Sequence, residues 1–310
     1  MKNHHNGIHH ITVLAGEAQR NATFYVKTLG LRMVKKSVNQ DDPGTYHLFY
    51  ANGEGTPGSD ITFFPWPQAV QSNPGVGQAV MVSFAVPSHS KDFWTQRLND
   101  KGVTFEGPSE RFGQERIRFK DPDGLQLELV FDEKVDELPA WEKSTVSDEF
   151  GIRGFWGTTL RLQNHQPTSE VLKSVFGFEE RAKEASVRLY TTDAPIGGSV
   201  IIEEAEPQAS TNGRGTVHHV AFRAEDEDEL KAMRREVIEM GLHPTEVIDR
   251  HWFHSVYFRS PGGVLFEIAT DGPGFAVDED PDKLGEKLIL APWLESRRKE
   301  IEAQLPEINV

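Results

Sequence analysis

The sequence of 310 residues contains no cysteine. This absence excludes disulfide bonds, thiolate zinc sites, iron–sulfur clusters and cysteine nucleophiles. Any metal ion bound by the chain must therefore use histidine and carboxylate ligands, and the sequence offers 12 histidines and 48 aspartates and glutamates for that purpose.

Positive charge is also scarce, because 33 lysines and arginines stand against the 48 acidic residues and give a net charge of −15. A surface of this sign repels phosphate backbones and anionic membranes, so we expect no nucleic-acid partner and no membrane partner. No run approaches the ~20 apolar residues that cross a bilayer. The opening MKNHHNG is polar and shows no signal peptide, and a cytoplasmic location is therefore expected.

The chain carries an internal repeat. Its length is about twice the usual ~150-residue domain, and a unit that begins with a strand and a helix recurs four times. The clearest match joins RFKDPDGLQLELV to YFRSPGGVLFEIA, which share a Pro-x-Gly turn and a glutamate separated from that glycine by three residues. We predict an α+β fold with an N-terminal lobe over 1–135, a polar linker over 136–150, a C-terminal lobe over 151–274 and a helical tail over 275–310.

Two pairs of adjacent histidines lie inside predicted strands, in GIHHITVL and TVHHVAF. Successive side chains of a strand point to opposite faces. His9 and His218 alternate with bulky apolar neighbours and are expected to face the core, so that His10 and His219 take the opposite face. By the same alternation Glu267 points away from its apolar neighbours in LFEIA. His10, His219 and Glu267 are therefore predicted to share the cleft-facing side of their strands.

Two imidazoles and one carboxylate that leave one side of a metal open are typical of non-haem Fe(II) sites that activate oxygen. A hydrogen-bonded strand histidine is the commoner arrangement, and an ion pair could satisfy Glu267. The repetition of the doublet in corresponding strands favours a metal. A buried, isolated carboxylate is costly, and a divalent cation supplies the missing charge.

The motifs HHIT, VHHVAF, PGGVLFEIAT and APWLE occur in this order along the chain. Together they resemble those of the hydroquinone-type ring-cleaving dioxygenases of the vicinal oxygen chelate superfamily. The resemblance covers nearly the whole chain. It implies a fold of four βαβββ modules in two lobes, with curved mixed sheets that enclose a metal site.

The resemblance also implies roles for individual residues. It makes His10, His219 and Glu267 the ligands of Fe(II), or of Mn(II), which accepts the same ligands, and it implies a small aromatic substrate and dioxygen as reactants. His9 or His218 is expected to take the phenolic proton at a pKa near the working range. The residues implied around the substrate and the oxygen are His9, Thr12, His218, Arg250 and Tyr257.

Two other functions remain open from the sequence: a metal-dependent isomerase or lyase of the glyoxalase type, and a non-catalytic protein that binds an aromatic or antibiotic ligand. Glyoxalase I, as a family, uses a second carboxylate, whereas the corresponding strand ITFFPWP offers Phe63 and Phe64. Glu128, the internal counterpart of Glu267, is interpreted as vestigial or solvated. A homo-oligomer is compatible with the sequence. Candidate walls of the pocket are Phe49, Phe63, Phe64 and Trp66.

Overall fold

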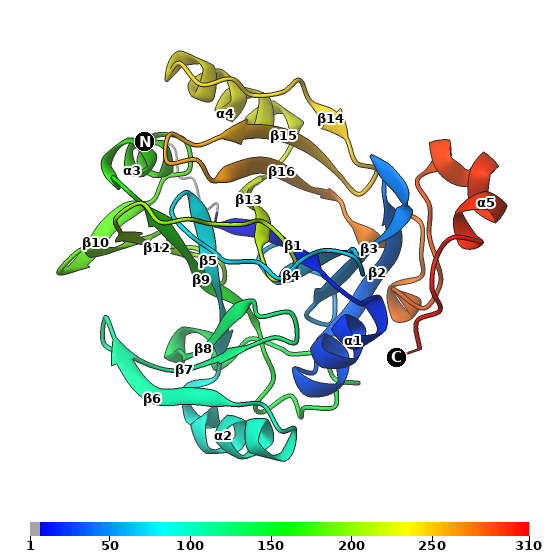
Figure 1. Cartoon of the computed structure of the whole chain (residues 1–310), viewed down its shortest axis with the longest axis horizontal. Helices are drawn as coiled ribbons and strands as arrows, with labels where there is room; N and C mark the ends of the chain where they lie inside the picture. Colours follow the sequence, from blue (N-terminus) through cyan, green and yellow to red (C-terminus); the bar gives the residue numbers. More distant parts are fainter. Residues whose placement is uncertain (1–6, 310) are drawn as a thin grey trace.

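The computed structural model describes residues 7–309, and the polar N-terminus that bears on a signal peptide falls largely outside this range. Two curved, mixed sheets of eight strands each form the body of the protein (Figure 1). Four modules of one strand, one helical segment and three further strands follow one another along the chain. The predicted α+β fold of four βαβββ modules is therefore confirmed.

The first two modules cover the N-terminal half of the chain. Module 1 contains β1 (Ile8–Ala15), α1 (Ala18–Ala22), the π-helical turn η1 (Thr23–Thr28), β2 (Arg32–Asn39), β3 (Asp42–Ala51) and β4 (Asp60–Pro65). Module 2 contains β5 (Gln78–Val86), the 3-10 turn η2 (Ser88–Ser90), α2 (Lys91–Asp100), β6 (Phe105–Arg111), β7 (Gln114–Lys120) and β8 (Gln126–Phe131). A short 3-10 turn follows, η3 (Glu133–Val135).

The last two modules repeat this order. Module 3 contains β9 (Gly154–Leu162), α3 (Gln166–Ser174), β10 (Glu179–Glu184), β11 (Val187–Thr191) and β12 (Ser199–Glu204). Module 4 contains β13 (Val217–Ala224), α4 (Glu227–Glu239), β14 (Ile248–Asp249), β15 (Phe253–Arg259) and β16 (Leu265–Pro273).

Each sheet combines modules from both halves of the chain. The first has the strand order β14-β15-β16-β13-β1-β4-β3-β2 and so joins module 4 to module 1. The second has the order β10-β11-β12-β9-β5-β8-β7-β6 and joins module 3 to module 2. Antiparallel pairs β1–β13 and β5–β9 connect the modules. The boundary at 136–150 stays a prediction, but neither half of the chain builds a sheet by itself.

The helices cover the outer faces of the sheets through apolar stripes. In α4 the buried residues are Leu230, Met233 and Val237, at the spacing that places them on one helical face. Asp226 caps this helix, because its side chain accepts a hydrogen bond from the Glu229 amide at 2.9 Å. The helix packs on β15 and β16, as Figure 1 shows at the top of the molecule. The apolar stripe of α4 therefore lies against the first sheet.

The segment after β16 returns to the edge of the first sheet. It consists of short helical turns: η4 (Phe275–Val277), η5 (Pro281–Lys283), η6 (Pro292–Arg297) and α5 (Arg298–Glu302). Lys35 on β2 is fully buried and anchors this segment, because its Nζ donates to the Phe275 carbonyl at 3.0 Å and to Asp278 Oδ1 at 2.6 Å. Glu279 accepts a third hydrogen bond from the same Nζ.

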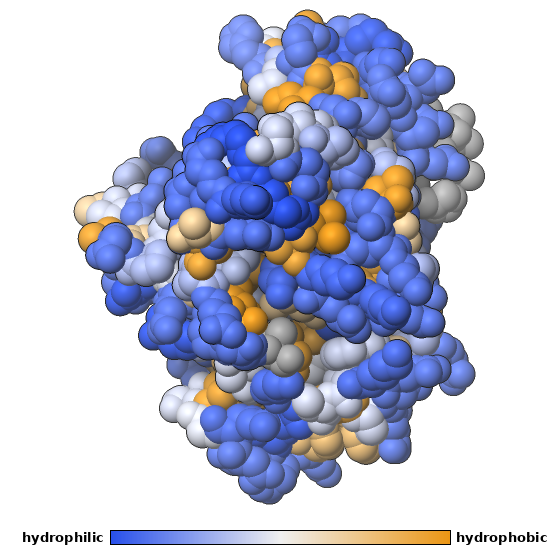
Figure 2. Space-filling view, turned by 90° about the vertical axis from the view of Figure 1, so that its right-hand side faces the viewer, coloured by the Kyte–Doolittle hydropathy of each residue, from blue (hydrophilic) through white to orange (hydrophobic). Residues whose placement is uncertain are grey.

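The face that carries α5 is mainly hydrophilic, with apolar side chains in small separate patches (Figure 2). Across residues 7–309 no helix combines the length and the apolar character that spanning a membrane requires.

Candidate metal centre

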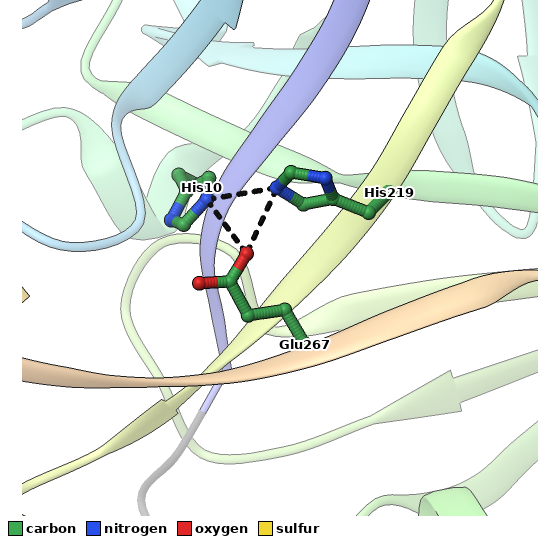
Figure 3. A group of neighbouring side chains, drawn as sticks. All are labelled: His10, His219 and Glu267. Atoms are coloured by element: carbon green, nitrogen blue, oxygen red, sulfur yellow. Dashed lines mark hydrogen bonds and ion pairs between the residues drawn. The ribbon is translucent and has the colours of Figure 1, made fainter. Parts of the chain in front are cut away.

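Three neighbouring strands, β1, β13 and β16, bring His10, His219 and Glu267 together (Figure 3). His10 Nε2 lies 3.2 Å from His219 Nε2 and 3.2 Å from Glu267 Oε2, and His219 Nε2 lies 2.8 Å from the same oxygen. All three side chains are buried. The alternation of β1, β13 and β16 thus places these residues as the sequence led us to expect, while their role as ligands stays a prediction.

The three facing atoms fit a single metal ion. Ligands about 2.1 Å from one ion are about 3 Å apart when their bonds are perpendicular and about 3.4 Å apart when they are tetrahedral. The observed 2.8–3.2 Å separations match the perpendicular arrangement. Glu267 Oε1 accepts a hydrogen bond from Ser255, whereas Oε2 is buried and has no well-oriented donor within the described chain. Oε2 and both Nε2 atoms are therefore available to a cation.

The electrostatics of the triad favour an ionised carboxylate. Burial alone would raise the pKa of Glu267, but the adjacent imidazoles of His10 and His219 outweigh burial and hold that pKa well below its usual value. Burial lowers the pKa of His219. A charged carboxylate beside an imidazole that tends to lose its proton is the ligand set that a divalent cation requires.

His9 and His218 lie beside the triad and not on the core face that alternation predicts. His9 is an extra residue in β1, because Ile8 pairs with Phe222 while His10 pairs with Ala221. His218 is likewise an extra residue in β13, since Thr12 pairs with His219 and the next residue pairs with Val217. Each doublet thus sits at a β-bulge, which redirects side chains in this way. The placement of His9 and His218 on the core face was wrong.

The bulges bring the two outer histidines, His9 and His218, into contact with the triad histidines that follow them in the sequence. His9 Nδ1 lies 2.9 Å from His10 Nδ1, and His218 Nδ1 lies 2.8 Å from His219 Nδ1. These contacts occupy the ring nitrogens that face away from the triad. They fix the orientation of both rings, as partners of metal-bound histidines generally do.

Neither outer histidine has the near-neutral pKa that we expected of a base. The protein packed around His9, and then the charge of His10, lower the pKa of His9 well below its usual value. The same two causes, with His219 as the neighbour, lower the pKa of His218 to about 3. Both rings are therefore neutral near pH 7.

Thr62 occupies the place where a second carboxylate would complete the site. Glu267 pairs with Ala221, two residues after His219, and Thr62 pairs with Thr12, two residues after His10. The counterpart of Glu267 is thus Thr62 and not Phe63 or Phe64. Its Oγ1 lies 2.8 Å from Thr12 Oγ1 and 2.9 Å from the Nε2 of His47. A neutral hydroxyl stands there in place of a charged ligand.

Tyr257 and Arg250 border the triad on the side opposite Thr62, because β15 and β4 flank the triad strands from opposite sides. Tyr257 pairs with Glu267 across the β15–β16 hairpin, and its ring centroid lies 5.6 Å from that of His219. The Arg250 guanidinium lies over the Tyr257 ring at 5.5 Å and donates to Asp41 Oδ2 at 3.1 Å. Burial raises the pKa of Tyr257, and the carboxylate of Glu267 raises it further, so the phenol keeps its proton.

A cavity of about 420 Å³ opens on the two triad histidines. Three of the four candidate wall aromatics line it, namely Phe49, Phe64 and Trp66, whereas Phe63 belongs to the hydrophobic core. Our sequence analysis missed His47, because a single histidine in a strand carries no repeat signal. The cavity is lined by His10, Asn39, Gln40, Asp41, His47, Phe49, Phe64, Trp66, His218, His219, Thr245, Arg250, Trp252, Phe253, Tyr257 and Leu265.

Glu128 on the second sheet is buried, so the solvated alternative for this residue was wrong. Its Oε2 accepts hydrogen bonds from Arg116 and Ser83 at 2.9 Å each, and its Oε1 accepts one from Arg118 at 2.9 Å. The second sheet therefore satisfies its buried glutamate with arginine.

Known proteins resemble this chain in both sequence and fold. The family model for the Glyoxalase/Bleomycin resistance protein/Dioxygenase superfamily matches residues 7–129 and 158–268. A Bacillus subtilis (strain 168) protein named "Putative ring-cleaving dioxygenase MhqO" is 42% identical over 304 residues, with 98% of this chain and 97% of that protein covered. The "Chlorohydroquinone/hydroquinone 1,2-dioxygenase" of Sphingobium indicum is 34% identical over 305 residues, with 95% and 94% covered.

Solved structures agree with these relatives. A crystal structure titled as a putative dioxygenase from Bacillus subtilis has a TM-score of 0.94 at 41% identity and covers 98% of this chain and 97% of that one. Glyoxalase I from Zea mays shares the fold at a TM-score of 0.64 and 14% identity, with 86% and 92% covered. The repeat, the paired sheets and these matches show that the chain belongs to the Glyoxalase/Bleomycin resistance protein/Dioxygenase superfamily.

Proposed function

We propose that this protein is an Fe(II)-dependent ring-cleaving dioxygenase that acts on hydroquinone-like aromatics. The observation that carries the proposal is the His10–His219–Glu267 triad, which opens into a cavity walled by aromatic side chains. Relatives that match almost the whole chain bear the names of ring-cleaving and hydroquinone dioxygenases. The enzyme class follows from these relatives, and the triad supports the choice of metal.

His10 Nε2, His219 Nε2 and Glu267 Oε2 would hold the ion. A bound Fe(II) ion would supply the Lewis acidity and the electron transfer that ring cleavage by dioxygen requires, and would ease loss of a phenolic proton. Mn(II) accepts the same ligand types. Thr62 leaves the neighbouring position without a charged ligand, so room remains for both reactants.

The cavity walls bind and orient the aromatic ring. Phe49, Phe64 and Trp252 provide apolar surface, which also excludes water from the reacting atoms. His9 and His218 hold the imidazoles of the triad in place through their Nδ1 contacts. His218 also lines the cavity. Because its Nδ1 accepts the Nδ1 proton of His219, whose Nε2 faces the ion site, the Nε2–H of neutral His218 can donate a hydrogen bond to an oxygen of the substrate.

The cavity wall formed by Arg250 and Tyr257 is suited to stabilise negative charge that develops on the substrate. Arg250 carries a permanent positive charge, and Tyr257 keeps its proton, so both are donors at the moment when oxygen atoms of the substrate become anionic. Thr12 contributes through its hydroxyl contact with Thr62. These five roles, for His9, Thr12, His218, Arg250 and Tyr257, belong to the proposal.

The test is to load the protein with Fe(II) or Mn(II) without oxygen, and then to admit oxygen with hydroquinone or catechol. Oxygen uptake and ring-cleaved product are followed together. We expect stoichiometric uptake in the wild type, none in His219→Ala or Glu267→Ala, and full activity in the control His243→Ala, whose side chain is exposed on a loop.

Two results would overturn the proposal. Conversion of a hemithioacetal without oxygen would identify an isomerase of the glyoxalase type. Saturable binding of aromatics with no turnover by either metal form would identify a binding protein.

A further inference from the structure

His47 brings a third imidazole into the cavity from the side opposite β13 and β16. It lies on β3 and lines the cavity together with His10 and His219. Within residues 7–309 no hydrogen bond or ring contact joins His47 to any member of the triad. His47 and the two triad histidines therefore face the same cavity without a direct contact between them.

The orientation of the His47 ring is fixed on three sides. Its centroid lies 3.9 Å from that of Phe49 and 4.4 Å from that of Phe64, which pack against its faces. Its Nε2 is 2.9 Å from Thr62 Oγ1, and that hydroxyl is 2.8 Å from Thr12 Oγ1. The hydroxyl that replaces a second carboxylate thus holds one nitrogen of His47.

The other nitrogen, Nδ1, is left for a ligand. In the described part of the chain no group forms a hydrogen bond with Nδ1. This atom is also not fully buried, so a ligand can reach it. Burial, followed by the charges of His10 and His219, lowers the pKa of His47 well below its usual value. The neutral ring offers Nδ1 as a hydrogen-bonding atom that carries no charge.

We propose that His47 Nδ1 binds the second hydroxyl of the substrate, across the ring from the hydroxyl at the triad. This inference rests on the proposed function and deepens it, because it names the class of ring that the site prefers. In a para-dihydroxylated ring the second hydroxyl points to the far side of the cavity, whereas in an ortho-dihydroxylated ring it lies beside the first. A simple phenol has no second hydroxyl for His47 to bind. His47 therefore selects hydroquinones over simple phenols.

Two substitutions separate the two nitrogens of His47. In His47→Asn the side-chain amide lies near the position of Nδ1, and in His47→Gln the amide reaches the position of Nε2. The asparagine variant keeps a polar group for the ligand and loses the contact with Thr62. The glutamine variant keeps the contact with Thr62 and loses the group that faces the ligand.

The experiment measures the anaerobic binding of hydroquinone and of phenol to the Fe(II)-loaded protein by calorimetry, in the wild type and both variants. We expect the wild type to bind hydroquinone about tenfold more tightly than phenol, as one net hydrogen bond allows. This ratio should fall to about one in His47→Gln and stay above one in His47→Asn, while the affinity for phenol changes little. Thermal unfolding shows that each variant is folded.

Equal ratios in the wild type and His47→Gln overturn the inference, as does a ratio near one in the wild type. A loss of affinity for both ligands alike would show that His47 only shapes the cavity, which also overturns it. These results leave the proposed function standing if oxygen-dependent cleavage of hydroquinone is still observed. If the wild type binds both ligands but cleaves neither, the proposed function fails instead.

Discussion

The Arg116 guanidinium donates a hydrogen bond to Glu128 at the place in the second sheet that corresponds to the proposed metal centre of the first. Ser255 pairs with Ala269, two residues after Glu267, and Arg116 pairs with Val130, two residues after Glu128. Arg116 is thus the counterpart of Ser255. The second sheet thus also has a buried glutamate, Glu128, but here the compensating positive charge comes from the side chain of Arg116.

The same comparison shows that the second sheet has no histidine at either corresponding position. Strand pairing places Met81 at the counterpart of His219 and Gly157 at the counterpart of His10. A Cβ atom at Gly157 would lie 2.0 Å from the Ser199 carbonyl oxygen, so no side chain fits there. One metal ion per chain, at the first sheet, is the expected stoichiometry.

Substitution of Arg116 tests the buried pair. Arg116→Met should lower the free energy of unfolding by about 3 to 5 kcal/mol, because it leaves the buried carboxylate of Glu128 without its buried partner. Arg118→Met should cost less, since Arg118 is 34% exposed and solvent screens its charge. Urea unfolding of both variants measures the difference, and equal losses would contradict this account of the pair.

Ser255 positions the proposed carboxylate ligand through its hydrogen bond to Glu267 Oε1. We expect Ser255→Ala to weaken Fe(II) binding about tenfold to a hundredfold, the usual effect of losing a group that orients a metal ligand. Ser83→Ala removes a similar bond, 2.9 Å long, from Glu128 in the other sheet and should leave metal affinity unchanged. Calorimetric titration with Fe(II) under argon compares the two, and equal affinities for all three proteins would refute the positioning role.

Stability should depend on pH through Asp121. Burial raises the pKa of this carboxyl to about 7 from 3.8, so the folded chain holds a proton that the unfolded chain has released. Because the folded state binds more protons between these values, stability falls as the pH rises from about 4 to about 7. At about 1.4 kcal/mol per pKa unit, the loss reaches about 4 kcal/mol.

Asp121→Asn removes this ionisation and keeps an acceptor oxygen for the Asp123 and Leu125 amides, which lie 2.8 and 2.9 Å from Oδ1. The variant should therefore be more stable than the wild type at pH 8, and this advantage should vanish at pH 4. Chemical denaturation at both values provides the measurement. An advantage that does not change with pH would mean that Asp121 is ionised in the folded chain.

Arg250 links the mouth of the cavity to Tyr257. Arg250→Met removes the charge and the contact over the Tyr257 ring, and should lower kcat/KM for hydroquinone about tenfold to a hundredfold. Arg235→Met removes an exposed arginine of α4 that does not line the cavity and should have little effect. Steady-state oxygen uptake is the measurement, and unchanged kinetics in Arg250→Met would remove this residue from the mechanism.

Much of the fold follows from local pattern. The recurrence of strand and helix signals predicted four modules, because each module forms the same elements from its own residues. The pairing of module 1 with module 4 depends on contacts between segments more than 200 residues apart, as in the Thr12–His219 pair. Such pairing leaves no mark in a single sequence.

The site was predicted in part for the same reason. Alternation placed His10, His219 and Glu267 correctly, but it cannot register an extra residue in one strand, so His9 and His218 were assigned to the wrong face. His47 and Thr62 carry no motif, and only the register between β1 and β4 shows that Thr62 stands opposite Thr12. The burial of Glu128 depends on an arginine twelve residues away.

The triad also has a consequence for biosynthesis. Its members stand at positions 10, 219 and 267, in the first and the last module of the chain. At about 5 to 20 residues per second, a ribosome finishes the last of them roughly 13 to 50 seconds after the first. A nascent chain therefore cannot assemble the complete triad until nearly the whole polypeptide has emerged, and metal binding at the proposed site is expected to follow translation.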